Sequence, residues 1–288
     1  MGPPCFGGSE SYCKGRRGER LSFDILTSVP GRLVAGFTLG AIIAVVAHRH
    51  RALSRSGALA AVVTAAACTA AGWTWAFLLI AFFLTGTGLS RFRESVKRAR
   101  TNSVVEKGGE RDAAQVLANG GVFAAAAIAS IIDPSDAWQV IGSAAIAASA
   151  ADTWASEIGT LSAHYPRSII TGRPVAPGTS GGVTAAGLAA SVAGAGFIAL
   201  VTFLSGWGLP AVCAAIAGGI AGSLFDSILG ATVQTKRWCA SCEIATERAI
   251  HICGTATTGI GGKDWLDNDA VNALSSMLGA LIGALCLL

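Results

Sequence analysis

Two carboxylates embedded in apolar segments are the first residues of this sequence that could do chemistry. Asp152 lies between Ser149 and Ser156, and the spacing i, i+3 and i+7 places all three on one stripe of a helix. Asp226 repeats the arrangement within residues 223–230. Charged side chains inside membrane helices are costly and usually functional. The pattern predicts that Asp152 and Asp226 face a membrane-embedded site; for Asp226, a structural ion pair with a buried arginine is the alternative.

Three further polar residues fall near the ends of apolar segments. Glu157 lies at the depth of Asp152 but on another helix face. Asp269 opens the last apolar segment, where its acidic neighbours could also cap the helix. Asn119 follows Gln115 by four residues, so the two share a helix face, where hydrogen bonding between helices is the alternative to a functional role. We expect Asn119, Glu157 and Asp269 to join the same site.

Carboxylates that converge on one face of a charge-poor protein attract cations. Without a cation between them they repel one another, and the repulsion is strong where water is scarce. Mg²⁺ meets the requirement, because it prefers carboxylates, waters and substrate phosphates as ligands. We therefore predict a magnesium site formed by Asp152, Asp226 and Asp269.

A glycine-rich segment supplies positive charge and hydrogen-bond donors that could bind phosphate. Residues 167–182 contain two arginines, several hydroxyls and a run of glycines directly before an apolar segment. Backbone N–H groups of such a loop and the start of a helix can bind phosphates, although a plain glycine-rich connector is the alternative. The predicted phosphate-binding residues here are Arg167, Arg173, Gly178, Thr179, Ser180, Gly181 and Gly182.

Four metal-ligating side chains lie in the longest polar segment. Cys239 and Cys242 are separated by two residues, and His251 and Cys253 follow. Three thiols and one imidazole at this spacing can complete a tetrahedral Zn²⁺ site that holds a polar loop together. The alternatives are reduced free thiols and a Cys239–Cys242 disulfide. We predict a structural zinc site.

Long uncharged segments position these residues. The protein has 288 residues, of which 52% are hydrophobic and only 13% charged, whereas soluble domains have about 25% charged residues. The uncharged run 174–225 is more than twice the roughly 20 residues that one membrane-spanning helix needs. Charges and Gly/Pro breaks indicate spans near 31–47, 57–71, 73–90, 113–132, 138–158, 181–204, 210–234 and 270–288.

The predicted fold class is all-α, a polytopic transmembrane helical bundle of about eight spans. The uncharged run 57–90 would extend about 51 Å as one helix, against a hydrocarbon core of about 30 Å. We therefore expect two short or re-entrant helices in that run. Residues 30–288 are predicted to form a single transmembrane domain, and residues 1–29 a loose N-terminal tail.

Basic residues indicate the orientation of the bundle. Lysine and arginine concentrate in the connections 48–56 and 91–111, and such loops usually lie on the cytoplasmic side. With eight spans, the polar loops 91–111, 159–180 and 235–269 share that side. Basic residues in the tail argue the other way and leave the orientation of the first span open.

The composition argues against several other classes of protein. The net charge of +4 does not indicate nucleic-acid binding, because the basic residues flank apolar segments and lack interleaved aromatic residues for stacking. Cysteines within apolar segments, such as Cys68 and Cys213, do not fit a secreted disulfide framework. The sequence has no Walker A motif and no recognisable Ser-His-Asp arrangement.

Several ordered motifs together resemble the integral membrane family that contains plant phytyl-phosphate kinase and animal transmembrane protein 19. The likeness covers roughly residues 30–288 and rests on the segments 108–111, 115–121, 151–159, 178–184, 222–227 and 267–272. The resemblance implies phosphorylation of a prenyl monophosphate, such as phytyl or geranylgeranyl phosphate, to its diphosphate, with CTP as the expected nucleotide. It also implies a lipid substrate, a nucleoside triphosphate and Mg²⁺.

The resemblance assigns roles to individual residues. Asp152, Glu157, Asp226 and Asp269 are expected to hold the divalent metal and the nucleotide, and Asn119 with residues 178–182 to position them. The cations expected to neutralise phosphates are Lys107, Arg111, Arg167 and Arg173. Phosphoryl transfer requires mainly alignment and charge compensation, which this set of residues could supply.

Two other functions use a similar set of residues. A CTP-dependent lipid cytidylyltransferase would form a CDP-lipid and release pyrophosphate, whereas a kinase releases a nucleoside diphosphate. An ion-coupled transporter would bind ions at glycine-broken helices near the centre of the membrane. The carboxylates lie near one end of the spans and no inverted repeat is evident, which argues against the transporter.

Overall fold

Helices form most of the described chain. The computed structural model describes residues 27–106 and 109–288, so the predicted tail lies almost entirely outside the described residues, and so does Lys107. The helices of the described part are α2 (Val29–Arg49), α3 (Arg55–Ala71), α4 (Trp73–Arg91), α5 (Glu94–Thr101), α6 (Ala113–Ile132), α7 (Ala137–Gly159), α8 (Ala185–Leu204), α9 (Leu209–Thr232) and α10 (Asn268–Leu285). All except α5 coincide with predicted spans, and the all-α membrane bundle is confirmed.

Five helices of the described chain are long and apolar enough to cross a membrane: α2, α4, α6, α8 and α9. Helix α3 is shorter, with 17 residues, and α7 and α10 carry the polar residues Asp152 and Asp269. Every residue of α7 from Gly142 to Ala151 is buried, because α4, α6, α8, α9 and α10 pack around it. A helix that is covered by other helices can carry polar residues that would be costly against lipid.

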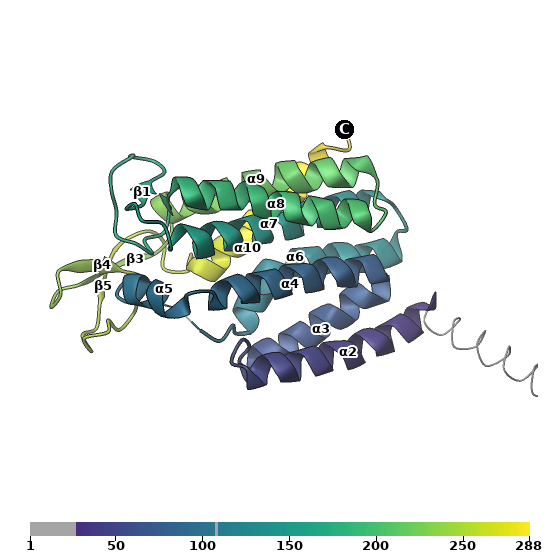
Figure 1. Ribbon diagram of the computed structural model, residues 1–288, viewed down its shortest axis with the longest axis horizontal. Coiled ribbons are helices and arrows are strands. Elements are labelled where there is room, and N and C mark those ends of the chain that lie inside the picture. Colours follow the sequence, from purple (N-terminus) through teal and green to yellow (C-terminus); the bar gives the residue numbers. More distant parts are fainter. Residues whose placement is uncertain (1–26, 107–108) are drawn as a thin grey trace, which may run out of the picture.

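The uncharged run 57–90 contains two helices that meet at Gly72. This residue has φ +156° and separates α3 from α4, and the two helices run in opposite directions through the bundle (Figure 1). With 17 residues, α3 is about 26 Å long, slightly less than the hydrocarbon core. The expectation of two helices in this run is therefore confirmed, but only α3 is short, because α4 has 19 residues and is long enough to cross a membrane.

Polar side chains cap the first turns of α6, α8 and α10. Asp112 and Gln115 form a capping box at the start of α6, and the Thr184 hydroxyl accepts a hydrogen bond from the N–H of Gly187 at the start of α8. Asp267 accepts a hydrogen bond from the N–H of Ala270, with a distance of 2.9 Å between nitrogen and oxygen. The local capping role is thus filled by Asp267, which leaves Asp269 to face the interior.

Small residues allow α7, α9 and α10 to approach closely. A Cβ atom added to Gly222 of α9 would lie 2.4 Å from the Cβ of Ala148 on α7. One added to Gly279 of α10 would lie 2.8 Å from the carbonyl oxygen of Ala144. These contacts are the close backbone packing that glycine- and alanine-rich membrane helices use. As a result, the polar ends of the three helices lie beside one another.

Short strands form within two of the polar loops. Strands β1 (Arg167–Ser168) and β2 (Gly182–Val183) pair antiparallel in the loop between α7 and α8. Strands β3 (Lys236–Cys239), β4 (Ile244–Thr246) and β5 (Thr258–Gly261) form an antiparallel sheet in the order β4-β3-β5 between α9 and α10. We call the segment 235–262 that contains this sheet the β-lobe.

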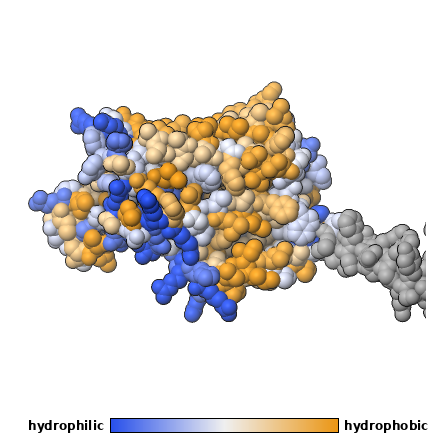
Figure 2. Space-filling view, viewed as in Figure 1, coloured by the Kyte–Doolittle hydropathy of each residue, from blue (hydrophilic) through white to orange (hydrophobic). Residues whose placement is uncertain are grey.

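The polar connections gather at one end of the bundle. Helix α5, both sheets and the turn after α2 lie at that end, whereas the α3–α4, α6–α7 and α8–α9 connections lie at the other (Figure 1). Hydrophilic residues crowd the same end, and most of the remaining visible surface is hydrophobic (Figure 2). The shared end of the three polar loops is therefore confirmed; its cytoplasmic location stays a prediction.

The close packing at Gly222 leads to a prediction about stability. Gly222→Ala should destabilise the protein by about 1–3 kcal/mol, because the added methyl group overlaps Ala148 and forces α7 and α9 apart. Gly196→Ala in α8 is the matched control, since no atom lies within 4 Å of its added Cβ and alanine is the better helix former by about 1 kcal/mol. Thermal unfolding of both purified variants measures the difference, and equal melting temperatures would contradict the packing argument.

Candidate functional site

A cavity of about 990 Å³ opens at the polar end of the bundle. Its walls come from α4 to α10 and from the polar loops, so segments far apart in sequence meet around it (Figure 1). The sequence-predicted residues that line it are Arg111, Asn119, Asp152, Glu157, Gly178, Thr179, Ser180, Gly181, Gly182, Asp226 and Asp269. The structure therefore brings most of the expected site together.

Three carboxylates from three helices face this cavity. Asp152 lies on α7, Asp226 on α9 and Asp269 on α10, where the Asp269 residue is only 7% exposed. The Asp226 Oδ2 atom accepts a hydrogen bond of 3.2 Å from the Ser275 hydroxyl, and the negative charge of Asp152 acts on Asp226. The Ser275 hydroxyl of α10 thus orients the Asp226 carboxylate without neutralising its charge.

Neither Asp152 nor Asp226 forms a salt bridge with a basic side chain among the described residues. Across residues 27–106 and 109–288, the salt bridges join Lys97 to Glu157 and Arg98 to Glu94. The structural alternative for Asp226, a buried arginine partner, is therefore not observed in this part of the chain. Asp152, Asp226 and Asp269 line one cavity, and carboxylate oxygens are ligands that Mg²⁺ prefers.

Glu157 has surroundings different from those of the three aspartates. Its carboxylate accepts hydrogen bonds from the Ser90 hydroxyl and from the Lys97 ammonium group, and the charge of Arg111 also acts on it. The Lys97 ammonium donates further to the carbonyl oxygens of Leu89 and Ser90, each at 2.7 Å. Glu157 therefore links α4, α5 and α7, and its charge is balanced within the protein.

Arg111 and Asn119 lie on the wall next to Glu157. The backbone of Arg111 pairs with residues 52–54 at the start of α3, and its guanidinium group donates to the Ser90 hydroxyl at 3.2 Å. The Asn119 side chain donates to the carbonyl oxygen of Gln115 on its own helix, and the Ser149 hydroxyl donates to the Asn119 carbonyl oxygen. Ser149 thus ties α7 to α6 and does not line the cavity.

The glycine-rich loop reaches the cavity but already binds an acidic side chain. Gly178 and Gly181 adopt φ of +88° and +75°, and a Cβ on Gly181 would lie 2.4 Å from the backbone nitrogen of Ala231, so this conformation requires glycine. The hydroxyl and the N–H group of Ser180 both donate to Glu247. Any phosphate at this loop would have to share its donors with Glu247.

Arg167 and Arg173, which were predicted to bind phosphate, do not line the cavity. Arg167 is exposed and donates to the carbonyl oxygen of Gly172 at 2.9 Å, within the turn that β1 and β2 close. Arg173 is also exposed, and neither residue lines the cavity. The loop turns at Gly172, where φ is +66°, and both arginines lie outside the cavity lining.

Two functional candidates were not predicted. Lys97 has a side chain only 9% exposed, yet in the sequence it is one of many basic residues in the connection 91–111. Glu247 hydrogen-bonds to Ser180 and also to the Gln234 side chain at 3.3 Å. No local pattern marks Glu247, because its neighbours along the chain are those of a polar loop and its partners come from elsewhere.

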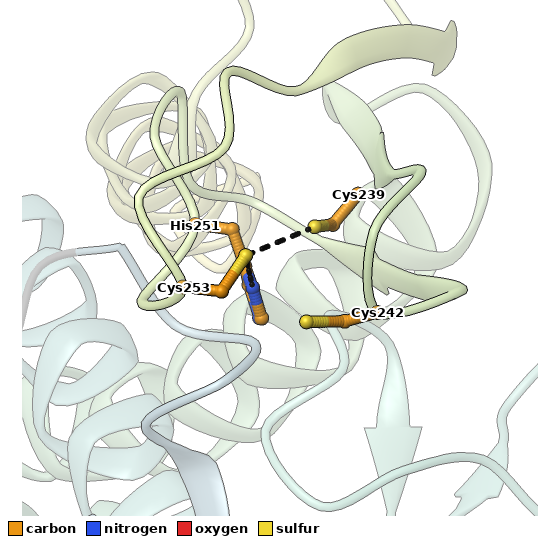
Figure 3. Close-up of side chains that lie close together, drawn as sticks. All are labelled: Cys239, Cys242, His251 and Cys253. Carbon is orange, nitrogen blue, oxygen red and sulfur yellow. Dashed lines mark hydrogen bonds between the residues drawn. The ribbon is translucent and has the colours of Figure 1, made fainter.

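The cysteine and histidine residues form a separate cluster. Cys239, Cys242, His251 and Cys253 lie together in the β-lobe (Figure 3), and none of them lines the cavity. The described cysteines are free, so the alternative of a Cys239–Cys242 disulfide is not observed.

Comparisons with known proteins agree with the sequence motifs. A family model described as integral membrane protein DUF92 matches residues 38–280. Protein PGR of Arabidopsis thaliana is 33% identical over 283 residues, covering 88% of this chain and 95% of the relative. An uncharacterized membrane protein of Methanocaldococcus jannaschii is 30% identical, covering 88% and 94% of the two chains, and one of Synechocystis is 30% identical, covering 74% of each. No solved structure matches.

The environment of Glu247 predicts a pH dependence of stability. Burial, aided by the nearby charge of Glu106, raises the pKa of Glu247 from 4.5 to about 7, against the opposing effect of the Ser180 hydrogen bond. The folded state therefore holds this proton more tightly than the unfolded state. The resulting stability is fully present below about pH 4.5 and is lost as the pH rises through about 7.

We expect the difference in melting temperature between the native protein and Glu247→Gln to change across that window. The native protein should lose stability relative to the variant as the pH is raised from 4.5 to about 7. Glu94→Gln is the control, because the Glu94 side chain is 44% exposed and pairs with Arg98. Parallel pH profiles for the native protein and Glu247→Gln would show that this carboxyl group titrates normally.

Proposed function

Because the chain belongs to the DUF92 family of integral membrane proteins, we propose that it is a membrane prenyl-phosphate kinase. It transfers a phosphoryl group from a nucleoside triphosphate, with CTP as the expected donor, to a prenyl monophosphate such as phytyl or geranylgeranyl phosphate. The observation that carries the proposal is the placement of Asp152, Asp226 and Asp269 around one cavity at the polar end of an apolar bundle.

The reaction matches the groups that line the cavity. An oxygen of the prenyl phosphate forms a bond to the terminal phosphorus of the nucleotide, and the bond from that phosphorus to the leaving nucleoside diphosphate breaks. The acceptor is already an anion, so no strong general base is needed. The protein has to align two highly charged phosphates and offset their repulsion.

The aspartates and the basic residues divide this task. Asp152, Asp226 and Asp269 would hold Mg²⁺, which supplies positive charge against the phosphate oxygens when it is bound. Arg111 lies in the cavity wall with its backbone fixed to the start of α3, so its charge would approach a phosphate from a defined side. Asn119, one turn of helix beyond Gln115, would orient the acceptor by hydrogen bonding.

A second, apolar cavity supports a lipid substrate. It lies between α2, α3, α4 and α6 and is lined mainly by aliphatic and aromatic side chains, including Ile43, Leu79 and Phe83. Its polar end shares Arg111, Asn119 and neighbouring residues with the large cavity. The volume of this apolar cavity is about 100 Å³, below the roughly 300 Å³ at which ligand pockets begin, so it has room for only part of a prenyl chain. A chain whose first carbons entered it would place its phosphate beside Arg111 and Asn119, within the polar cavity.

The site is proposed to open toward the cytoplasm. The end of the bundle that carries the cavity also carries the basic connections 48–56 and 91–111, and positive charge is retained on the cytoplasmic side of membranes. The connections at the opposite end, 133–136 and 205–208, contain no lysine or arginine. A soluble nucleotide would reach the aspartates from that side without crossing the membrane.

The purified protein, incubated with CTP or ATP, Mg²⁺ and a series of prenyl monophosphates, should form prenyl diphosphate and a nucleoside diphosphate. Asp226→Asn should lower turnover about 10²-fold or more, the scale on which the loss of one preorganised electrostatic group slows catalysis. Its melting temperature should stay close to that of the native protein, because the amide keeps the shape and can still pair with Ser275. Asp136→Asn, at the opposite end of the bundle, is the control and should keep full turnover.

Three other outcomes of this assay would contradict the proposal. Release of pyrophosphate with a CDP-lipid would identify a cytidylyltransferase, and no turnover with any lipid phosphate would remove the kinase proposal. Near-normal turnover of Asp226→Asn with a lowered melting temperature would show that Asp226 is structural.

A further inference from the structure

Four potential metal ligands converge in the β-lobe from separate parts of the chain. Cys239 ends β3, Cys242 lies in the turn before β4, and His251 and Cys253 lie in the loop before β5. Their side chains point toward one another (Figure 3), and one donor atom from each lies within 4.8 Å of the others. The cluster is outside the cavity, so the proposed reaction does not account for it.

The distances in the cluster fit a shared metal ion. The sulfur atoms of Cys239 and Cys253 are 3.6 Å apart, far beyond the roughly 2.05 Å of a disulfide bond. With Zn–S bonds of about 2.3 Å, two sulfurs on a tetrahedral zinc ion are about 3.8 Å apart. The Nδ1 atom of His251 is 3.2 Å from the Cys253 sulfur, whereas tetrahedral zinc places nitrogen and sulfur about 3.5 Å apart.

We propose that Cys239, Cys242, His251 and Cys253 bind one Zn²⁺ ion as a structural site. Three thiolates and one imidazole select zinc over Mg²⁺, which prefers oxygen ligands. Four protein ligands complete the tetrahedron and leave no open position for a substrate, which is the arrangement of structural zinc sites.

The β-lobe needs such a site because it has little core of its own. Its strands are only three or four residues long, all four residues of β5 are exposed, and so are Ile250 and Ile252. Sheets this small are marginal in water without a hydrophobic face to bury. The zinc site therefore supplies stability that apolar packing does not, as in other small metal-bound folds.

The zinc site also positions one wall of the cavity. Glu247 lies four residues before His251, and its N–H group donates to the carbonyl oxygen of Val104 beyond α5 at 2.9 Å. Arg237, two residues before Cys239, lines the cavity and donates to the Thr257 hydroxyl at 2.8 Å. The zinc ligands are thus positioning residues that act through Glu247 and Arg237.

Metal analysis of the full-length protein, purified under reducing conditions, tests the site without any use of activity. We expect one zinc ion per chain, and loss of most of it in Cys242→Ser with a lowered melting temperature. Cys213→Ser is the matched control, because Cys213 is an exposed cysteine of α9 outside the cluster, and it should keep its zinc.

A second measurement covers the case in which Cys242→Ser does not fold. After zinc is removed from the native protein with a chelator, added Co²⁺ should bind and give the absorption bands of tetrahedral Co²⁺ with thiolate ligands, and added Zn²⁺ should displace it because zinc binds such sites more tightly. Native protein without zinc and without Co²⁺ bands, or zinc retained by both Cys242→Ser and Cys253→Ser, would overturn the proposal. None of these results depends on the kinase assay, so the two proposals can fail separately.

Discussion

The mutual repulsion of carboxylates in a charge-poor membrane bundle is the constraint on which the account of this protein depends. Asp152 and Asp226 come from adjacent central helices, and the charge of one acts on the other. In surroundings with few water molecules such repulsion is larger than at an exposed surface. The described salt bridges provide no basic partner for either residue, so a bound cation is the simplest way to stabilise both in their charged form.

The rest of the bundle brings these charges together. Glycines in α9 and α10 allow close approach to the alanine-rich face of α7, and neighbouring helices bury α7 from Gly142 to Ala151. Glu157, whose charge is balanced by Lys97, ties the cavity to α4 and α5. The wall opposite consists of polar loops, and the β-lobe holds Glu247 against Ser180. Rigid small-residue packing therefore positions the carboxylates, and hydrogen-bonded loops complete the cavity.

The helices and the three aspartates are predictable from the sequence because each leaves a local signal. Apolar runs of sufficient length indicate spans, and a carboxylate inside such a run stands out at helical spacing. Lys97 and Glu247 leave no such signal, because charged residues are common in polar loops and burial by distant segments is not visible along the chain. Arg167 and Arg173 show the converse: a basic, glycine-rich segment suits phosphate binding, yet Arg167 donates to the carbonyl oxygen of Gly172 in its own turn and neither arginine lines the cavity.

Binding of Mn²⁺ to the purified protein, followed by electron paramagnetic resonance, shows whether Asp152 and Asp226 hold a divalent cation. Mn²⁺ prefers the same oxygen ligands as Mg²⁺ and carries unpaired electrons that report the bound fraction. The account predicts saturable Mn²⁺ binding to the native protein without nucleotide, competition by Mg²⁺, and marked weakening in Asp152→Asn and in Asp226→Asn. Absence of binding, or equal binding by the native protein and both variants, would contradict it.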